Sequence, residues 1–341
     1  MTVFLIIIVV ALFAITIWQL TKIFQLSRDS RTVDSSQIAN NKDNKIQGYL
    51  SLIFGAAFYA AMLYCFWNYT QLTLPSASSK HGLEYDNLML ITMVIIMIVQ
   101  VITQGLLYYF SFKYRGQKGR KALFFADNDK LEFIWTIIPV IVLSGLIIYG
   151  LFTWSDIMDV DEAENPLVIE VYAKQFSWTA RYAGEDNVLG KANVRFIEGA
   201  NTVGVNPADP YANDDKITRE LHLPEGRPVL FKFRSQDVLH SAYFPHFRAQ
   251  MNVIPGMITQ FSFTPIVTTE EIRETEYMIE KMEDIHRIRK EKSQELVAAG
   301  EAPLPPYEEF DYYLLCNKIC GVAHYNMQMK IVVETPEEYQ A

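Results

Sequence analysis

Four long apolar stretches in the first half of the chain constrain its fold most strongly. Each is about as long as a helix must be to cross the hydrocarbon layer of a membrane, and they cover about 3–24, 49–69, 87–111 and 132–153. Four such stretches argue against a soluble helical core. The first lacks a basic segment and an obvious cleavage site, so we interpret it as an anchor rather than a signal peptide. The sequence therefore predicts a transmembrane region over 1–155.

The balance of charge changes where the apolar stretches end. Residues 1–155 carry 12 Lys and Arg against 8 Asp and Glu, whereas residues 156–341 carry 18 against 31. These net charges of +4 and −13 account for the −9 of the whole chain. We therefore expect an acidic domain outside the membrane over 156–341, with membrane lipid but no nucleic acid among the partners of the chain.

The loops between the apolar stretches predict the orientation. Basic residues are concentrated in the loops 25–48 and 112–131, while the loop 70–86 holds only Lys80. Positively charged loops stay on the inner side of a membrane. The arrangement that agrees with this rule has the N-terminus and the acidic C-terminal domain on the outer side. Cleavage after the first stretch would reverse this agreement.

Short runs rich in β-branched and aromatic residues follow Trp154, and Pro and Gly punctuate them. Such runs are typical of strands in an antiparallel β-sandwich. The strands that we expect are Leu167–Tyr172, Val229–Arg234, Met257–Phe263, Tyr312–Leu315 and Lys330–Val333.

A short stretch near the C-terminus carries the residues of a metal site. Cys316, Cys320, His324 and Met327 offer two thiolates, an imidazole and a thioether, a set that favours copper because zinc sites rarely use Met. Two thiolates that face each other can each bridge two metal ions. A second imidazole must then come from elsewhere, and His240, after a strand-like run, is the best candidate. A structural zinc site with two Cys and two His is the alternative.

The remaining histidines show no ligand-type spacing. We expect them in loops or at the surface, and they are His81, His222, His246 and His286. His246 is only six residues from His240 and is the one that merits attention.

The motifs Asp237-Val-Leu-His240-Ser and Cys316-x-x-x-Cys320-Gly-x-x-His324-x-x-Met327 resemble those of subunit II of the haem-copper cytochrome c oxidases. The resemblance implies a cupredoxin-like Greek-key domain with a binuclear copper centre, CuA. This centre accepts electrons from cytochrome c and passes them to the haem of subunit I, which reduces oxygen to water and translocates protons. The implied copper ligands are His240, Cys316, Cys320, His324, Met327 and the backbone carbonyl of Lys318.

The same resemblance assigns roles to residues outside the ligand loop. Glu132 opens the last apolar stretch, where the family places a carboxylate at the entrance of a proton pathway into subunit I. Phe176 and Trp178 fall where the family has an aromatic patch that receives electrons, although Phe176 replaces a Trp of the family pattern. The third and fourth apolar stretches match the two spans of the family, so the first two look like an N-terminal extension.

The chain departs from the family pattern in two places. Lys318 stands where the family has a Glu whose carboxylate helps to hold magnesium, and an ammonium group cannot bind that ion. We therefore expect the magnesium to be absent or held differently. The second departure is a helical insertion over about 267–307, which begins with a capping-box pattern at Thr268 and Glu271. The insertion could cap the sandwich or dock another respiratory complex, and docking is our preferred hypothesis.

The resemblance also predicts partners and location. We expect oxidase subunits I and III and a cytochrome c, free or as a domain of another respiratory complex, with the C-terminal domain on the periplasmic side of a bacterial plasma membrane. A quinol oxidase subunit should lack the copper ligands, and nitrous oxide reductase should lack this run of spans. A membrane-tethered copper donor or a zinc-stabilised binding module is the alternative from a different class.

Overall fold

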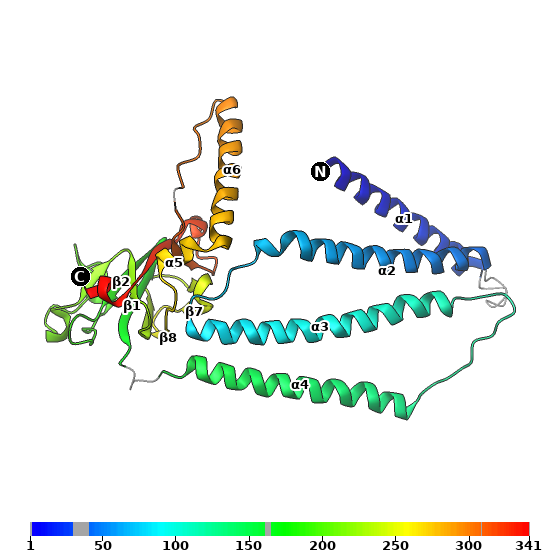
Figure 1. Ribbon diagram of the computed structural model, residues 1–341, viewed down its shortest axis with the longest axis horizontal. Helices are drawn as coiled ribbons and strands as arrows, with labels where there is room; N and C mark the ends of the chain where they lie inside the picture. The colour runs from blue at the N-terminus through cyan, green and yellow to red at the C-terminus, as the bar shows by residue number, and fades with distance from the viewer. Residues whose placement is uncertain (1, 30–40, 161–164, 308, 341) are drawn as a thin grey trace. The chain divides into compact units, whose positions relative to one another are not determined.

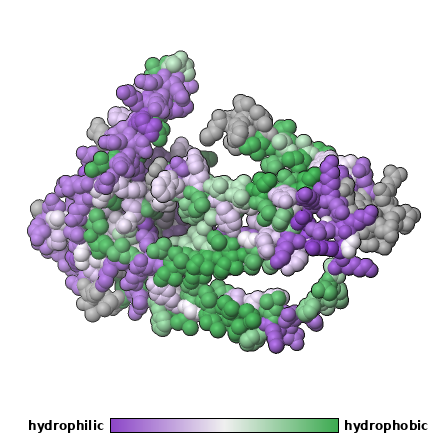
Figure 2. All heavy atoms as spheres, turned by 45° about the vertical axis from the view of Figure 1, so that its right-hand side comes forward, coloured by the Kyte–Doolittle hydropathy of each residue, from purple (hydrophilic) through white to green (hydrophobic). Residues whose placement is uncertain are grey.

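The four predicted spans are helices (Figure 1). The structure, a computed structural model, describes residues 2–29, 41–160, 165–307 and 309–340. Each of these helices contains a segment that is long and apolar enough to cross a membrane, and hydrophobic residues gather over them in Figure 2. Their bounds are α1 Thr2–Asp29, α2 Asn41–Tyr69, α3 Lys80–Lys113 and α4 Asp129–Met158.

The chain divides into two compact units, 1–68 with 95–134 and 69–94 with 135–341. In the first unit, α2 packs closely against α3. A Cβ atom at Gly55 would lie 2.6 Å from the ring of Tyr108, so only glycine allows this approach. Small residues let membrane helices come close enough for extensive van der Waals contact. The second span is therefore a packing partner of the third.

In the second unit, the segment between α2 and α3 is bound to the β-domain. The Ser78 N–H donates to the carbonyl of His246 at 2.8 Å, and the Ser79 hydroxyl donates to the carbonyl of Phe247 at 2.7 Å. An ion pair between Arg248 and Asp86, with Nε 2.8 Å from Oδ1, adds to this contact. The residues 70–86, which run into the start of α3, are therefore attached to the β-domain.

The β-domain consists of two five-stranded sheets, with the orders β3-β2-β1-β5-β8 and β4-β10-β9-β6-β7. The predicted strands are all present, although the third is shorter than expected and begins at Thr259. The bounds are β1 Leu167–Lys174, β2 Ser177–Tyr182, β3 Lys216–Thr218, β4 Leu221–Pro224, β5 Val229–Ser235, β6 His240–Phe244, β7 Ala249–Val253, β8 Thr259–Phe263, β9 Tyr312–Cys316 and β10 Gln328–Glu334.

The four membrane helices and the β-sandwich confirm the predicted fold class, but the sheets are mixed rather than antiparallel. β1 pairs with β5 in parallel, and β10 pairs with β4 in parallel. Alternation of apolar residues reports which face of a strand is buried and not the direction of its neighbour, so the expectation of a fully antiparallel sandwich was wrong. Stacked phenylalanines fill the core: the ring centroids of Phe231 and Phe263 are 5.1 Å apart, and those of Phe247 and Phe263 are 4.9 Å apart.

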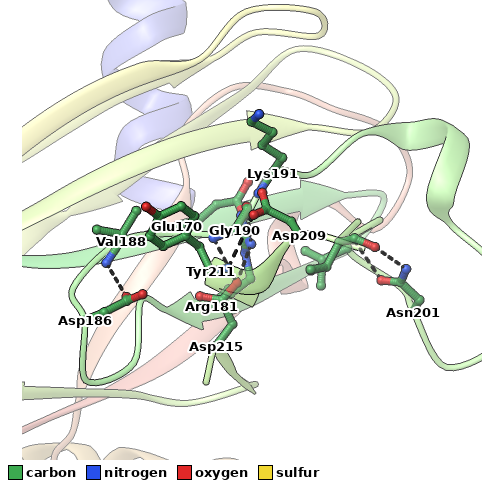
Figure 3. A network of polar contacts seen from close by, with 12 residues as sticks. Glu170, Arg181, Asp186, Val188, Gly190, Lys191, Asn201, Asp209, Tyr211 and Asp215 are labelled. Carbon is green, nitrogen blue, oxygen red and sulfur yellow. Dashed lines mark hydrogen bonds and ion pairs between the residues drawn. The ribbon is translucent and has the colours of Figure 1, made fainter. Parts of the chain in front are cut away.

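A network of buried charges ties β1 and β2 to the loop that follows β2 (Figure 3), and an ion pair between Arg234 and Glu170 joins β5 to it. Arg181, only 2% exposed, donates from Nε to Glu170 at 2.6 Å and from Nη1 to Asp215 at 2.7 Å. The same Nη1 atom donates to the carbonyl of Gly190 at 2.7 Å. Glu170 also accepts from Arg234, so each buried charge has at least one partner of opposite sign. Buried charges need such compensation because their desolvation costs several kcal/mol per ion.

The insertion forms two helices rather than one, α5 Thr269–Glu274 and α6 Glu276–Ala298. The capping box between Thr268 and Glu271 is present as predicted. The chain then returns along α6, where the Leu304 N–H donates to the Ser293 hydroxyl at 3.1 Å and His286 Nε2 donates to the carbonyl of Tyr307 at 2.6 Å.

The amphipathic stripe of α6 is covered by this returning segment. The inward positions recur at helical spacing and are buried or half-buried: Met278, Met282, Ile285, Arg289 and Ser293. The exposed apolar residues Ile279, Ile288 and Val297 are nine positions apart, which places successive ones on opposite faces of the helix. Among the described residues, the insertion therefore presents no single apolar face to a partner, and α6 projects away from the two sheets rather than lying across them (Figure 1).

His246 lies in a short turn after β6, as expected, but its imidazole is largely buried. The ring packs edge-on against Phe310 and Tyr312, with centroid distances of 5.0 and 5.5 Å. Nε2 is buried without a hydrogen-bond partner among the described residues. Burial, reinforced by the positive charges of Lys281 and Arg248, lowers the pKa of His246 to about 4.

The β-domain should therefore lose stability in mild acid. A histidine whose pKa is about 6.5 unfolded and about 4 folded binds its proton more readily in the unfolded chain, so stability falls as pH drops from about 6.5 towards 4. The full loss is about 3 kcal/mol. We expect His246→Phe, which keeps the aromatic packing, to reduce the fall in Tm between pH 7 and pH 4.5, as measured by near-UV circular dichroism. The control is His286→Phe, at an exposed position, whose Tm should fall between pH 7 and pH 4.5 by as much as that of the wild type. Equal falls in the Tm of all three proteins would contradict the prediction.

Candidate metal centre

The sheet order brings the two predicted ligand segments together. β9 ends at Cys316, and the loop that follows returns to β10, with the Cys316 N–H donating to the carbonyl of Met327 at 3.0 Å to close its base. β9 also pairs with β6, which begins at His240. The Asn317 N–H donates to the carbonyl of Ser241 at 3.0 Å. The pairing of β6 with β9 therefore places His240 beside the ligand loop.

All six predicted donor groups meet at this point. The two thiol sulfurs, Cys316 Sγ and Cys320 Sγ, are 3.8 Å apart. Around Cys316 Sγ lie His240 Nδ1 at 3.8 Å and the carbonyl oxygen of Lys318 at 3.2 Å. Around Cys320 Sγ lie His324 Nδ1 at 3.7 Å and Met327 Sδ at 3.8 Å. Each thiol thus has one imidazole and one weaker donor as neighbours.

The cluster is buried on one side and open on the other. His240 is fully buried and Met327 is 1% exposed, while Cys316 and His324 are half-buried. The rim of the ligand loop is apolar and strongly exposed, at Ile319, Val322 and Tyr325. The donors are therefore held in the interior of the β-domain, and His324 is the imidazole nearer to the surface.

Hydrogen bonds orient the buried histidine. His240 Nε2 lies 2.9 Å from Asp237 Oδ1, and in the neutral imidazole this nitrogen carries the proton. Nδ1 then carries the free lone pair, and this metal-binding atom faces the two sulfurs. A carboxylate that fixes the tautomer of a metal-binding histidine is a common supporting contact in metal sites.

The donor set fits soft metal ions. Metal–thiolate bonds of about 2.3 Å allow one ion to contact both sulfurs across their separation of 3.8 Å. A closed tetrahedral zinc site takes four ligands, whereas this site offers six donors that include a thioether. In the metal-free protein, burial raises the pKa of the Cys320 thiol to about 11, so metal binding must displace its proton. The arrangement suits two ions that share the thiolates better than one zinc ion.

The structure brings the predicted aromatic residues to the same site. The Trp178 Nε1–H donates to the carbonyl of Met327 at 3.3 Å, and its ring centroid is 6.0 Å from that of His240. Phe176 is half-buried and packs under Gly321 in the ligand loop. Trp178 is 2% exposed, so it lines the site and offers almost no surface to a partner.

Glu132 belongs to the other compact unit, in the first turn of α4. The structure therefore gives it no part in the metal centre. Sequence reasoning did not assign roles to Asp237 and Gln175, both of which support the ligands. A signal for Asp237 existed, because it stands three residues before His240 in the quoted motif. Gln175 directly precedes the aromatic pair Phe176 and Trp178, but the local sequence does not indicate its contacts with the ligand loops.

Comparisons with known proteins identify the family of the chain. Residues 67–152 match the family described as the transmembrane domain of cytochrome c oxidase subunit II. The alternative cytochrome c oxidase subunit 2 of Bradyrhizobium diazoefficiens is 31% identical over 235 residues, which are 68% of this chain and 69% of that protein. This chain belongs to the cytochrome c oxidase subunit II family. The matched segment contains α3 and most of α4, so the third and fourth spans are those of the family.

One further relative and two solved structures share less sequence identity with this subunit II. Cytochrome c oxidase subunit 2 of Thermostichus vulcanus is 23% identical over 295 residues, or 78% of this chain and 76% of that one. The crystal structure of the periplasmic domain of subunit II of cytochrome oxidase of Bradyrhizobium japonicum is 18% identical with a TM-score of 0.28, covering 51% of this chain and 88% of that one. A cryo-EM structure of a haem-copper terminal oxidase dimer gives 14% identity and a TM-score of 0.31, covering 60% of this chain and 99% of that one.

Family membership confirms the predicted enzyme class. This subunit II is a membrane-bound component of a haem-copper oxidase complex, and other oxidase subunits are its partners. Membership also implies copper, and the cluster of His240, Cys316 and Cys320, whose ligand atoms all lie within 4.8 Å of one another, offers suitable donors.

Proposed function

We propose that this subunit holds a binuclear copper centre, CuA, that accepts electrons from cytochrome c. The electrons would pass to the haem of subunit I, where oxygen is reduced to water and protons are translocated. The observation that supports this best is the pair of thiols 3.8 Å apart, each with its own imidazole. The proposed ligands are His240, Cys316, Cys320, His324, Met327 and the carbonyl of Lys318.

When bound, the copper pair would supply one-electron redox chemistry. The residues of the chain hold the donors in place and shield the inner side of the cluster from water. β6, β9 and β10 fix both ends of the donor set, and the hydrogen bond from His240 to Asp237 fixes one imidazole. Strands on both sides limit movement of the ligands between oxidation states, so little structural change needs to accompany electron transfer.

The charge of the β-domain supports cytochrome c as the electron donor. The position of the loop 70–86 supports the proposed orientation of the β-domain relative to the membrane. A net charge of −13 on 156–341 suits a basic electron donor, whose association should slow as salt rises. The loop 70–86, with Lys80 as its only basic residue, is bound to the β-domain. Under the positive-inside rule, this supports a periplasmic β-domain in a bacterial plasma membrane.

Two further roles are part of the proposal. Glu132, at the N-terminal end of α4, would stand at the entrance of a proton pathway into subunit I. Phe176 and Trp178 would form the aromatic side of the electron path, with Trp178 acting through its contacts with His240 and the carbonyl of Met327.

Metal analysis tests the proposal directly. The full-length subunit, purified in detergent and loaded with copper, should bind two copper ions, and its oxidised form should show electron-spin hyperfine coupling to two equivalent copper nuclei. A single bound copper ion, with coupling to one nucleus, would instead favour a membrane-tethered copper donor. A colourless zinc-bound protein that does not take up copper would favour a zinc-stabilised binding module. In the intact complex, we expect magnesium at the Lys318 position to be absent, because an ammonium group is not a ligand. Ordinary magnesium content at that subunit interface would contradict this.

A further inference from the structure

The turn between β1 and β2 lies against both ligand-bearing segments. The Gln175 backbone N–H donates to Asp237 Oδ2 at 2.7 Å, and its side-chain Nε2 donates to the carbonyl oxygen of Cys320 at 2.5 Å. Asp237 and Cys320 belong to different loops, one before β6 and the other between β9 and β10. A single residue therefore bonds to both loops.

Each of these two bonds leads directly to a proposed ligand. Asp237 uses its other oxygen, Oδ1, to accept from His240 Nε2 at 2.9 Å. Cys320 is itself a proposed ligand, and the hydrogen bond that it accepts is at its own backbone carbonyl. A chain of hydrogen bonds thus connects Cys320 to His240 through the side chain and backbone of Gln175 and the carboxylate of Asp237.

The ligand loop rests on this turn without a gap. Gly321 has a φ of +145°, and a Cβ atom added there would lie 2.8 Å from the Phe176 ring and 2.9 Å from Gln175 Nε2. Only glycine permits this approach of the loop to the turn. Close packing on one side and a hydrogen bond on the other restrict where the Cys320 backbone can lie.

We infer that Gln175 is a positioning residue of the metal centre that couples the Cys320 loop to the His240 loop. The inference rests on the proposed function for its meaning, because the coupling matters only if both loops hold one centre. A bridge of this kind sets the relative position of two ligands that are 80 residues apart in the sequence. Groups that support metal ligands typically change metal affinity by about 10–100-fold when they are replaced.

Two near-isosteric substitutions break the bridge at different points. Gln175→Glu keeps the length of the side chain but removes the N–H that the Cys320 carbonyl needs. Asp237→Asn keeps one oxygen for His240 but places an NH₂ group opposite the Gln175 N–H. Gln236→Glu is the matched control, because it makes the same change of charge at an exposed position of the His240 loop whose side chain has no hydrogen bond among the described residues.

Amide hydrogen exchange of the metal-free, full-length subunit in detergent tests the coupling. We expect Gln175→Glu to speed exchange about tenfold, both in residues 316–321 and in residues 236–241, while Gln236→Glu leaves both at wild-type rates. Asp237→Asn should also speed exchange in residues 316–321, because it removes the acceptor that anchors the Gln175 backbone N–H. Unchanged exchange in β5 and β10 would show that the sandwich remains folded in each variant.

A second readout uses the copper-loaded subunit. We expect copper to dissociate about tenfold faster from Gln175→Glu than from Gln236→Glu. An exchange effect confined to one loop, or a Gln175→Glu variant that matches the control in both readouts, would overturn the inference. If the wild-type subunit failed to bind two copper ions, the proposed function would fail, but the exchange comparison would still decide whether Gln175 couples the loops.

Discussion

Cys320→Ser is expected to abolish electron transfer through this subunit almost completely. Cys320 Sγ is the central donor of the cluster, within 3.8 Å of Cys316 Sγ, His324 Nδ1 and Met327 Sδ. A hydroxyl is a hard, weak donor that cannot replace a shared thiolate. We expect the rate at which reduced cytochrome c reduces the assembled oxidase to fall at least about a hundredfold, because loss of a supporting group alone costs up to that much.

The matched control is Cys65→Ser, which makes the same atomic change in α2, outside the cluster. Stopped-flow reduction of the two purified complexes, with copper content measured on the same samples, separates loss of the centre from loss of the subunit. If the complex with Cys320→Ser were reduced as fast as the complex with Cys65→Ser, electrons would bypass the proposed centre. The assignment of Cys320 as a shared ligand would then fail.

Local spacing is why the ligand loop could be predicted from the sequence. Cys316, Cys320, His324 and Met327 lie within a single short connection between two strands, and the apolar alternation of β9 and β10 was itself visible. The four spans were equally predictable, because a helix must satisfy its own backbone in lipid and thus needs an unbroken apolar run. In both cases the information lies within one segment of the chain.

The features that escaped prediction depend on which segments meet. The parallel pairing of β1 with β5 joins strands that are separated by three others in the sequence, and no local pattern encodes it. The same holds for Gln175, whose partners are 62 and 145 residues away. The binding of Ser78 and Ser79 to the β-domain likewise appears only in three dimensions, because a short polar loop reads as a simple connection between spans.

The buried ion network around Arg181 also joins segments that are distant in the sequence, and we expect its loss to reduce stability strongly. We expect Arg181→Met to destabilise the β-domain by about 3–5 kcal/mol, because the change leaves the carboxylate of Asp215 buried without its cation and removes one of the two cations beside Glu170. For a domain of this size, the loss should lower the Tm by roughly 10 °C. Thermal unfolding at pH 7, followed by near-UV circular dichroism of the detergent-solubilised subunit, measures this shift.

Arg287→Met in α6 makes the same substitution at a surface ion pair with Asp284, where water solvates both charges. Its Tm should match that of the wild type. Equal Tm values for Arg181→Met and Arg287→Met would mean that water reaches Asp215 and Glu170 once the guanidinium is removed. In that case the loop joined to β2 by the network would open without loss of the sandwich, and exchange of the Gly190 amide, which donates to Asp215, would become fast in Arg181→Met alone.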